Sequence, residues 1–283
     1  MITRVSTRIT WPIPEPDLPV DVHPALAAMA RAASAAYGDA RRAHTRAELG
    51  EQVADGADGT PTMRVDRLVE DPVAEVAAAQ GVNLLSEEAG FVDNGSAVTV
   101  VVDPVDGSSN AAAGVPLCCF AATASVDGEA TEALTVWLDT GRVWHAFAGH
   151  ATAYRTTGRT SLDGAAVNLL RPHRRSAEAW QRIANKAGRV RVMSTTVLEC
   201  ALVAEGSIDA FCDPGSDTHR IVDLATAMVT VPAAGGAVLD AYGRRLEIDP
   251  DLTRRWSGIA AATPALAEAV AETVRDGNQT RIA

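Results

Sequence analysis

The fold of this chain is organised around residues 103–110, which read Asp-Pro-Val-Asp-Gly-Ser-Ser-Asn. The preceding residues 97–102 are rich in valine, with one threonine, and this β-branched run predicts a buried strand. Pro104 ends that strand because proline has no amide hydrogen to donate to a ladder. Asp106 and Gly107 then favour a tight turn. Two carboxylates three residues apart therefore stand at the exit of a predicted strand.

The residues after this turn are small. Gly107, Ser108 and Ser109 allow backbone N–H groups to approach an anion. Acids beside such amides fit a divalent metal that lies between carboxylates and a phosphate group, since Mg²⁺ prefers oxygen ligands and often binds substrate phosphate. An ordinary Asp-Gly turn is the alternative interpretation, and this stretch alone leaves it open.

Composition limits the class of protein. The 283 residues suffice for one large domain or two ordinary ones, with 47% apolar and 22% charged residues, the balance of a globular protein. A net charge of −11 argues against non-specific binding to nucleic acid or an anionic membrane. Lys186 is the only lysine, which disfavours a Schiff base or a Walker-type phosphate site.

The cysteines and the N-terminal residues indicate the cellular compartment in which the protein is expected. The four cysteines show neither a C-x-x-C motif nor a partnered histidine spacing, and a reduced, cytoplasmic protein fits them best. Prolines at positions 12, 14, 16 and 19 interrupt the first 20 residues. We therefore expect neither an export signal nor a membrane-inserted segment.

The first part of the chain predicts an irregular arm followed by two helices. Residues 1–24 are rich in proline and read as an extended arm. Alanine-rich residues 24–53 predict a long helix with an interruption at Gly38. Apolar residues at helical spacing predict a second helix over residues 66–79, kinked at Pro72.

Strand signals follow. Two strands are predicted at 82–85 and 97–102, and turn signals then separate four more, at 117–126, 131–138, 142–147 and 151–155. Sequential hairpins imply an antiparallel sheet. Together with the helices before them, the strands predict an α+β metal-binding domain over residues 25–158.

Residues 156–175 show little periodicity and mark the predicted domain boundary. Beyond it, helices are predicted at 177–187, 195–205, 221–232 and 265–274, and strands at 190–193, 208–211 and 237–239. This alternation predicts a second, α/β domain over residues 159–283 with a mainly parallel sheet between helices.

Four further segments complete a pattern. Residues 56–62 read Gly-Ala-Asp-Gly-Thr-Pro-Thr, residues 86–88 Ser-Glu-Glu, residues 222–225 Val-Asp-Leu-Ala and residues 234–236 Ala-Gly-Gly. Together with residues 103–110, and in this order, they resemble the inositol monophosphatase superfamily, the Mg²⁺-dependent, lithium-sensitive sugar and inositol phosphatases that include fructose-1,6-bisphosphatases. The first segment is most similar to the archaeal-type branch, whose members often accept both inositol monophosphate and fructose bisphosphate. The resemblance covers most of the chain and implies a layered α-β-α-β-α sandwich.

The resemblance also implies a set of metal ligands. Glu87, Asp103 and the carbonyl of Val105 match the ligands of a first metal. Asp103, Asp106 and Asp223 match those of a second. Two or three Mg²⁺ ions are therefore expected, which Mn²⁺ can replace. Paired metals suit phosphate-ester hydrolysis because they polarise the phosphoryl group, activate water and stabilise the leaving alkoxide.

Three side chains match catalytic positions of the family. Asp66 and Ser108 stand where relatives hold the attacking water, with Ser108 in place of the threonine of many relatives, and Glu87 is counted with them. Glu88 is interpreted as a solvated neighbour, with binding of a third metal or its water through Glu87 as the alternative. Glu70 lies one helical turn after Asp66 and is interpreted as part of a polar helix face, with an acid outside the ligand shell as the alternative.

Substrate contacts are expected on two sides. Asp106, Gly107 and Ser108 match phosphate-facing positions, and Thr195 matches a position where relatives contact the sugar or inositol. Val222 replaces the tryptophan of many inositol phosphatases, and alanines occupy positions 111–113, where relatives often have larger or aromatic residues. Both departures predict a wider pocket. The substrate therefore stays open at this stage.

The leading hypothesis is an Mg²⁺-dependent phosphomonoesterase that hydrolyses a small sugar, inositol or cyclitol phosphate with metal-activated water. A 3′-phosphonucleotide or histidinol-phosphate phosphatase of the same superfamily is one alternative. A non-catalytic phospho-sugar-binding protein is another, although a binder would not need every metal ligand. As in relatives, a homodimer or higher homo-oligomer is expected, with no nucleic-acid or membrane partner.

Overall fold

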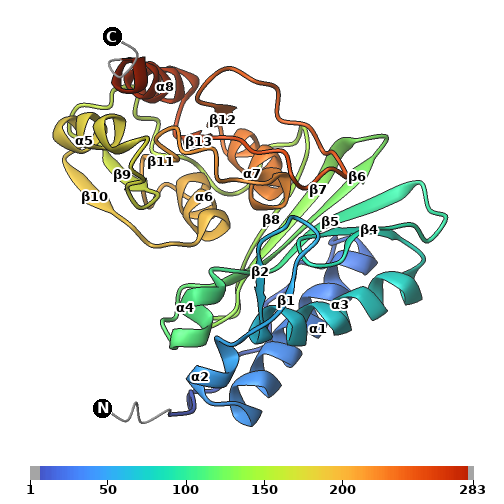
Figure 1. The fold of residues 1–283 in the computed structure, drawn as a ribbon. Helices are drawn as coiled ribbons and strands as arrows, with labels where there is room; N and C mark the ends of the chain where they lie inside the picture. Colours follow the sequence, from blue (N-terminus) through green and yellow to red (C-terminus); the bar gives the residue numbers. More distant parts are fainter. Residues whose placement is uncertain (1–6, 280–283) are drawn as a thin grey trace, which may run out of the picture.

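The computed structural model describes residues 7–279, with only the backbone of Gln279, and these residues form five layers, α-β-α-β-α (Figure 1). Helices α1 (Pro24–Ala43) and α3 (Arg64–Gln80) cover the outer face of a six-stranded sheet. Helices α6 (Thr196–Ala204) and α7 (Ile221–Ala233) lie between this sheet and a five-stranded one. Helices α5 (Ala177–Lys186) and α8 (Pro264–Gln279) cover the far side of the second sheet. The expected layered sandwich is confirmed.

The six-stranded sheet has the order β4-β3-β5-β6-β7-β8. Its strands are β3 (Asn83–Ser86), β4 (Gly90–Val92), β5 (Val98–Asp106), β6 (Cys119–Val126), β7 (Glu129–Trp137) and β8 (Arg142–Phe147). The antiparallel hairpins from β6 to β8 are confirmed, and β5 also pairs antiparallel with β6. In contrast, β3 and β5 run parallel, which places the ends of both strands at the same edge.

The five-stranded sheet has the order β10-β9-β11-β13-β12. Its strands are β9 (Ala166–Leu169), β10 (Arg189–Arg191), β11 (Ala210–Cys212), β12 (Ala237–Asp240) and β13 (Gly258–Ala261). Strand β9 is parallel to β10 and β11, as the α/β alternation predicts, whereas β13 is antiparallel to β11 and β12. Sequence reasoning missed β9 and β13 because each has only four residues and few β-branched side chains.

The strand predicted at residues 151–155 is wrong. The backbone N–H groups of Thr152 and Thr156 donate to the carbonyl oxygens of Ala233 and Ala234, each at 3.2 Å. These acceptors lie at the end of α7. The segment is therefore tied to a helix terminus and adds no strand to the sheet.

The first predicted helix is too long. Helix α1 runs through Gly38 without a break but ends at Ala43. Thr45 is extended and forms a capping box with Glu48, so a separate short helix, α2 (Arg46–Leu49), begins there. Strand β1 (Gln52–Asp55) follows and pairs with β2 (Pro61–Met63), where the sequence predicted helix and loop.

The N-terminal arm is irregular over its described residues 7–23, as predicted. Trp11 fixes it: the indole Nε1 donates to Asp139 Oδ1 at 2.8 Å, and the Arg41 guanidinium lies 4.6 Å from the centre of the indole ring. Arg41 Nη1 also donates to Asp139 at 2.7 Å. The arm is therefore held against α1 and the end of β7. The division into domains at residue 158 stays a prediction.

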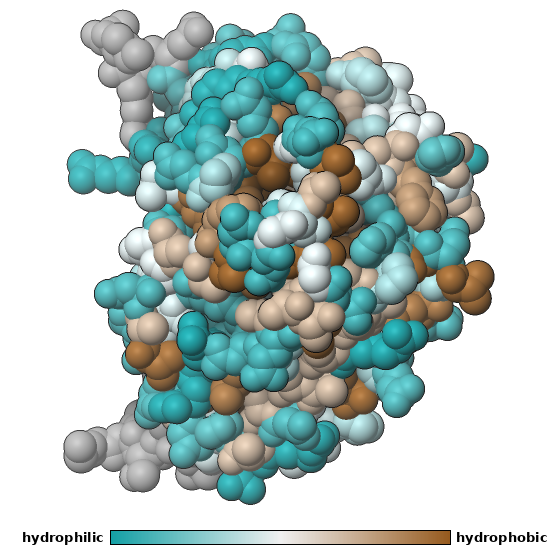
Figure 2. Space-filling model, turned by 90° about the vertical axis from the view of Figure 1, so that its right-hand side faces the viewer, coloured by the Kyte–Doolittle hydropathy of each residue, from teal (hydrophilic) through white to brown (hydrophobic). Residues whose placement is uncertain are grey.

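Apolar side chains fill the space on both faces of each sheet, in one large cluster under α1 and α3 and in smaller ones around α6, α7 and α8. On the face in Figure 2, polar residues surround separate apolar groups. Exposed large apolar side chains such as Val53, Phe91 and Val192 come from different segments. Within residues 7–279 no helix is long and apolar enough to cross a membrane.

Candidate active site

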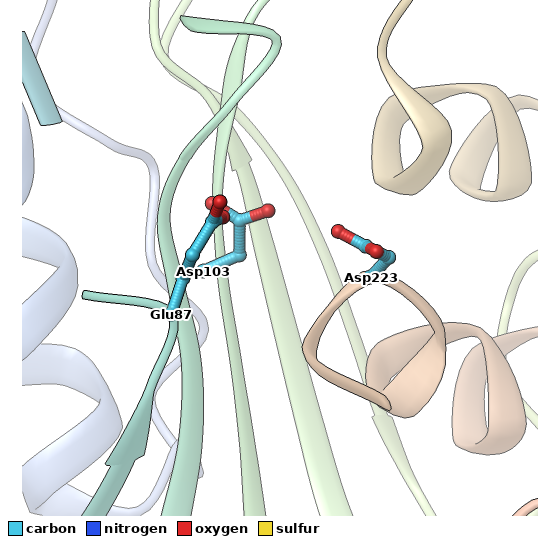
Figure 3. Close-up of side chains that lie close together, drawn as sticks. All are labelled: Glu87, Asp103 and Asp223. Carbon is cyan, nitrogen blue, oxygen red and sulfur yellow. The ribbon is translucent and has the colours of Figure 1, made fainter. Parts of the chain in front are cut away.

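Three carboxylates meet at the edge where β3 and β5 end. The parallel register pairs Ser86 with Val102, so the next residues, Glu87 and Asp103, lie side by side. Asp223 enters from the first turn of α7 and faces them across the gap between the layers (Figure 3). Their carboxylate oxygens lie within 4.8 Å of one another.

A bulge in β5 arranges the two aspartates of the opening stretch. Asp103 pairs with Ala121 and Asp106 with Cys119, so three steps on β5 correspond to two on β6. Side chains three residues apart point to opposite faces of a regular strand, and one extra residue returns them to the same face. Both aspartates are consequently buried on the side of α6 and α7.

Asp106 ties the two halves of the chain together. Its carboxylate accepts hydrogen bonds from the Thr195 hydroxyl, from Thr196 N at 3.2 Å and from Val197 N at 3.0 Å. It thereby satisfies the first amides of α6, which have no partner within the helix. Asp106 is not part of the three-carboxylate cluster. The Thr195 hydroxyl donates its hydrogen bond to Asp106. Their roles in metal and substrate binding stay predictions.

The turn after Asp106 requires glycine. Gly107 has φ +85°, and a Cβ atom there would lie 2.7 Å from the carbonyl oxygen of Leu117. The short helix α4 (Ser108–Ala113) starts directly after it. The Ser108 hydroxyl donates to the Val105 carbonyl at 2.9 Å, so this predicted metal-binding carbonyl already accepts one hydrogen bond.

Negative charge exceeds positive charge in the cluster. Burial raises the pKa of Asp103 well above its usual value, and Glu87, Asp106 and Asp223 raise it further. Burial likewise raises the pKa of Glu87 to about 8. Burial also acts on Asp223, but Arg220 outweighs it and lowers the pKa of that carboxyl. A bound cation would relieve this repulsion.

Asp66 and Ser108 come together as the sequence predicted. Asp66 lies in the first turn of α3, where its carboxylate accepts from Met63 N at 3.1 Å. Burial raises the pKa of Asp66 to about 6, and a hydrogen bond with the Ser108 side chain lowers it in part. The pair thus lies beside the acidic cluster. The catalytic role of Asp66 and Ser108 stays a prediction.

The interpretation of Glu70 as part of a polar helix face is wrong, whereas that of Glu88 as a solvated neighbour stays a prediction. Glu70 is 1% exposed and accepts from the Ser86 hydroxyl and from Ala89 N at 3.1 Å. It therefore anchors the loop that carries Glu87. Glu88 is partly buried, accepts from the Thr62 hydroxyl, and has a pKa that burial raises to about 7. Helical spacing alone could not separate Glu70 from an exposed position on α3.

Sequence reasoning assigned no role to Arg220 or Asp58. Arg220 precedes α7 at the N-cap position, where a small polar residue is usual, and this unusual residue type was the available signal. Its guanidinium contacts Asp58, Glu87 and Asp223. Asp58 lies in the quoted segment 56–62, but only the fold brings it to the site.

The wider pocket inferred from Val222 is not supported. Val222 is 1% exposed and packs with Leu85, Val101 and Trp256. It is a core residue between α7 and the six-stranded sheet. Its replacement of tryptophan therefore concerns packing in this chain.

The donor set fits a hard divalent cation. Glu87, Asp103 and Asp223 offer only carboxylate oxygens, which suit Mg²⁺ or Mn²⁺, and the cluster contains no nitrogen or sulfur ligand. The four cysteines are buried, and burial raises the pKa of each thiol well above its usual value. They are therefore poor metal ligands.

Comparison with known proteins agrees with this site. A model of the inositol monophosphatase family matches residues 21–279. The chain is 33% identical over 239 residues to a fructose-1,6-bisphosphatase/inositol-1-monophosphatase of Thermococcus kodakarensis, which covers 81% of this chain and 89% of the relative. It is 30% identical over 204 residues to the protein of the same name from Methanocaldococcus jannaschii, covering 72% and 81%.

Solved structures show the same fold. A protein of Pyrococcus horikoshii with similarities to inositol-1-monophosphatase superposes with a TM-score of 0.69 at 26% identity, covering 81% of this chain and 88% of that one. Both archaeal relatives bear names that include phosphatase activities. The chain therefore belongs to the inositol monophosphatase family, in its archaeal-type branch, and with it to the phosphoric monoester hydrolases.

Proposed function

We propose that this chain is an Mg²⁺-dependent phosphomonoesterase that hydrolyses a small sugar, inositol or cyclitol phosphate by direct attack of water. The observation that carries the proposal is the convergence of Glu87, Asp103 and Asp223 within 4.8 Å. These three carboxylates would hold the metal. When bound, Mg²⁺ supplies polarisation of the phosphoryl group and a lowered pKa for water.

Residues of the chain itself would accept the proton of the attacking water and position the phosphate. Asp66, with a pKa raised to about 6, suits a group that accepts a proton from the attacking water near neutral pH. The Ser108 hydroxyl lies close enough to Asp66 to lower the pKa of its carboxyl, and by turning from the Val105 carbonyl it can donate to that carboxylate. Asp106 holds the start of α6 against the Gly107 turn, so that the backbone amides of this turn and the Thr195 segment keep fixed positions around the substrate.

The substrate class follows the archaeal relatives, whose names join fructose 1,6-bisphosphate and inositol 1-phosphate. Both are phosphate monoesters of small polyhydroxylated rings or chains. A 3′-phosphonucleotide or histidinol phosphate stays an alternative, which no residue described above favours. The non-catalytic binding protein is no longer needed as an explanation, given the phosphatase family.

Phosphate release tests the proposal. The metal-free enzyme is assayed against inositol 1-phosphate, fructose 1,6-bisphosphate, a 3′-phosphonucleotide and histidinol phosphate, each with EDTA, Mg²⁺ or Mn²⁺. Hydrolysis of the first two with Mg²⁺ or Mn²⁺, and none in EDTA, is expected. Full hydrolysis in EDTA would refute the metal requirement, and a clear preference for the nucleotide or histidinol phosphate would replace the substrate class.

A homodimer is proposed from the family resemblance, with the first helix or the β6–β8 sheet as candidate surfaces. Light scattering at micromolar concentration is the test, because obligate interfaces persist there. A particle of only about 30 kDa, close to the 29.5 kDa chain, would reject it. Cytoplasmic location also stays a prediction.

A further inference from the structure

Arg220 is an internal cation in the acidic cluster. Its side chain is only 16% exposed and spans three carboxylates from three segments. Nη1 donates to Glu87 and, at 2.9 Å, to Asp58 Oδ2, while Nη2 and Nε donate to the two oxygens of Asp223 at 2.9 and 3.1 Å. A guanidinium with this fork geometry binds carboxylates strongly and keeps its charge at every working pH.

The contacts of Arg220 overlap with those that a metal needs. Glu87 and Asp223 are two of the three carboxylates whose oxygens converge within 4.8 Å. An oxygen that accepts from a guanidinium has less electron density for a metal, and two cations at this distance repel each other. Arg220 and a divalent cation therefore compete for the same ligands, above all for Glu87.

Asp58 is a second carboxylate partner that Arg220 can keep when Glu87 binds a metal. The Asp58 side chain is fully buried, and its Oδ2 already accepts from the same Nη1 that contacts Glu87. Asp58 also accepts from Arg255 Nη2, at 3.2 Å on its carbonyl and 3.3 Å on Oδ2. Arg220 can therefore lose its hydrogen bond to Glu87 and retain the one to Asp58, so that its buried charge stays paired.

We propose that Arg220 is a built-in counter-cation: it holds Glu87 and Asp223 in place in the metal-free chain and sets the metal affinity by competing for Glu87. This inference rests on the proposed metal site. It assigns Arg220 a positioning role, with no contact to the reacting atoms.

Metal binding and metal-free stability together test the inference. Mn²⁺ titration of the purified metal-free protein, followed by the electron paramagnetic resonance signal of free Mn²⁺, gives the dissociation constant. For Arg220→Met we expect Mn²⁺ to bind about 10- to 100-fold more tightly, the equivalent of a lost charged hydrogen bond. The melting temperature of the metal-free variant should fall, because its carboxylates lose their partner.

Arg255→Met is the matched control. Arg255 contacts Asp58 but neither Glu87 nor Asp223 in its described hydrogen bonds. We expect this variant to lose stability without a change in Mn²⁺ affinity. If Arg220→Met does not fold, Arg220→Lys replaces it: a single ammonium cannot reproduce the fork, so Mn²⁺ binding should still be tighter than in the wild type.

The outcomes separate this inference from the proposed function. Weaker or unchanged Mn²⁺ binding by the Arg220 variant, with normal binding by the wild type, overturns the inference alone. A wild-type protein that binds no Mn²⁺ overturns the proposed metal site and this inference with it. Inorganic phosphate should inhibit wild type and variant equally at saturating metal; a large loss of phosphate affinity would instead make Arg220 a phosphate ligand.

Discussion

Asp139 and Asp103 are both almost completely buried carboxylates, but their surroundings differ in charge. Asp139 faces one arginine, Arg41, at 2.7 Å, and the two side chains are 2% and 1% exposed. Trp11 adds a neutral hydrogen bond to the same carboxylate. One negative charge is thus met by one positive charge, and this cluster holds the N-terminal arm against α1.

The cluster around Asp103 is unbalanced. Four carboxylates, from Asp58, Glu87, Asp103 and Asp223, share two guanidinium groups, from Arg220 and Arg255. The pKa of Asp103 is raised well above its usual value, whereas that of Asp223 is lowered. Burial and an arginine are common to both regions. Surplus negative charge, and not burial, therefore distinguishes a metal-ligand site from a structural ion pair.

The sharpest test of this contrast is Asp103→Asn. If the surplus charge serves a metal, activity should fall roughly 10⁴-fold, since several kcal/mol of transition-state stabilisation depend on the metal. The metal-free protein should become more stable, because the amide removes a charge that burial and three acids oppose. Steady-state kinetics and thermal unfolding in EDTA measure both. Wild-type turnover in this variant would exclude Asp103 as a ligand.

Asp139→Ala should behave in the opposite way. It leaves the buried Arg41 unpaired, which costs about 3–5 kcal/mol of unfolding free energy, while kcat and KM of the folded fraction stay unchanged. Denaturant unfolding gives the free energy. The double variant Asp139→Leu/Arg41→Met should recover part of the loss. A fall in kcat with unchanged stability would contradict a purely structural role for Asp139.

Asp66→Asn and Ser108→Ala probe the proton-handling pair beside the cluster. Each should lower kcat by at least about 10²-fold with KM nearly unchanged, because the pair acts mainly in the transition state. Ser108→Thr should remain active, since the hydroxyl returns. A large rise in KM with intact kcat would move both residues from water activation to substrate binding.

The smallest expected effect is on the pH dependence of metal-free stability. Glu87 has a pKa of about 8 in the folded chain and about 4.3 when unfolded. Between these values the folded state binds more protons, so stability is greatest at low pH and falls as pH rises. The melting temperature in EDTA should therefore drop from pH 5 to pH 8.

Mg²⁺ provides the control for this pH effect. It should raise the melting temperature more at pH 8 than at pH 5, because ligands must lose their protons to bind. Asp240 has a pKa lowered below its usual value, so its contribution is lost only at acid pH, below this window. A melting temperature in EDTA that rises from pH 5 to pH 8 would contradict the surplus of negative charge.

Local sequence patterns were sufficient to predict the helices with a clear apolar stripe and the hairpins with clear turns. Helix α7 begins at Ile221 as predicted, and β6, β7 and β8 lie where alternation and Gly-containing turns placed them. Local periodicity suffices for these elements because their burial pattern repeats within a few residues. The order of the motifs was enough to identify the family, because several short segments at the right positions are far more specific together than any one of them alone.

The arrangement of the acidic side chains, in contrast, depends on contacts between distant parts of the chain. The parallel register of β3 and β5 brings Glu87 beside Asp103, and the bulge in β5 turns Asp106 toward α6. The partnership of Arg220 with Asp58 joins residues 162 positions apart. Charge balance in a buried cluster depends on which distant side chains share one low-dielectric space, and local sequence patterns contain no information on such distances.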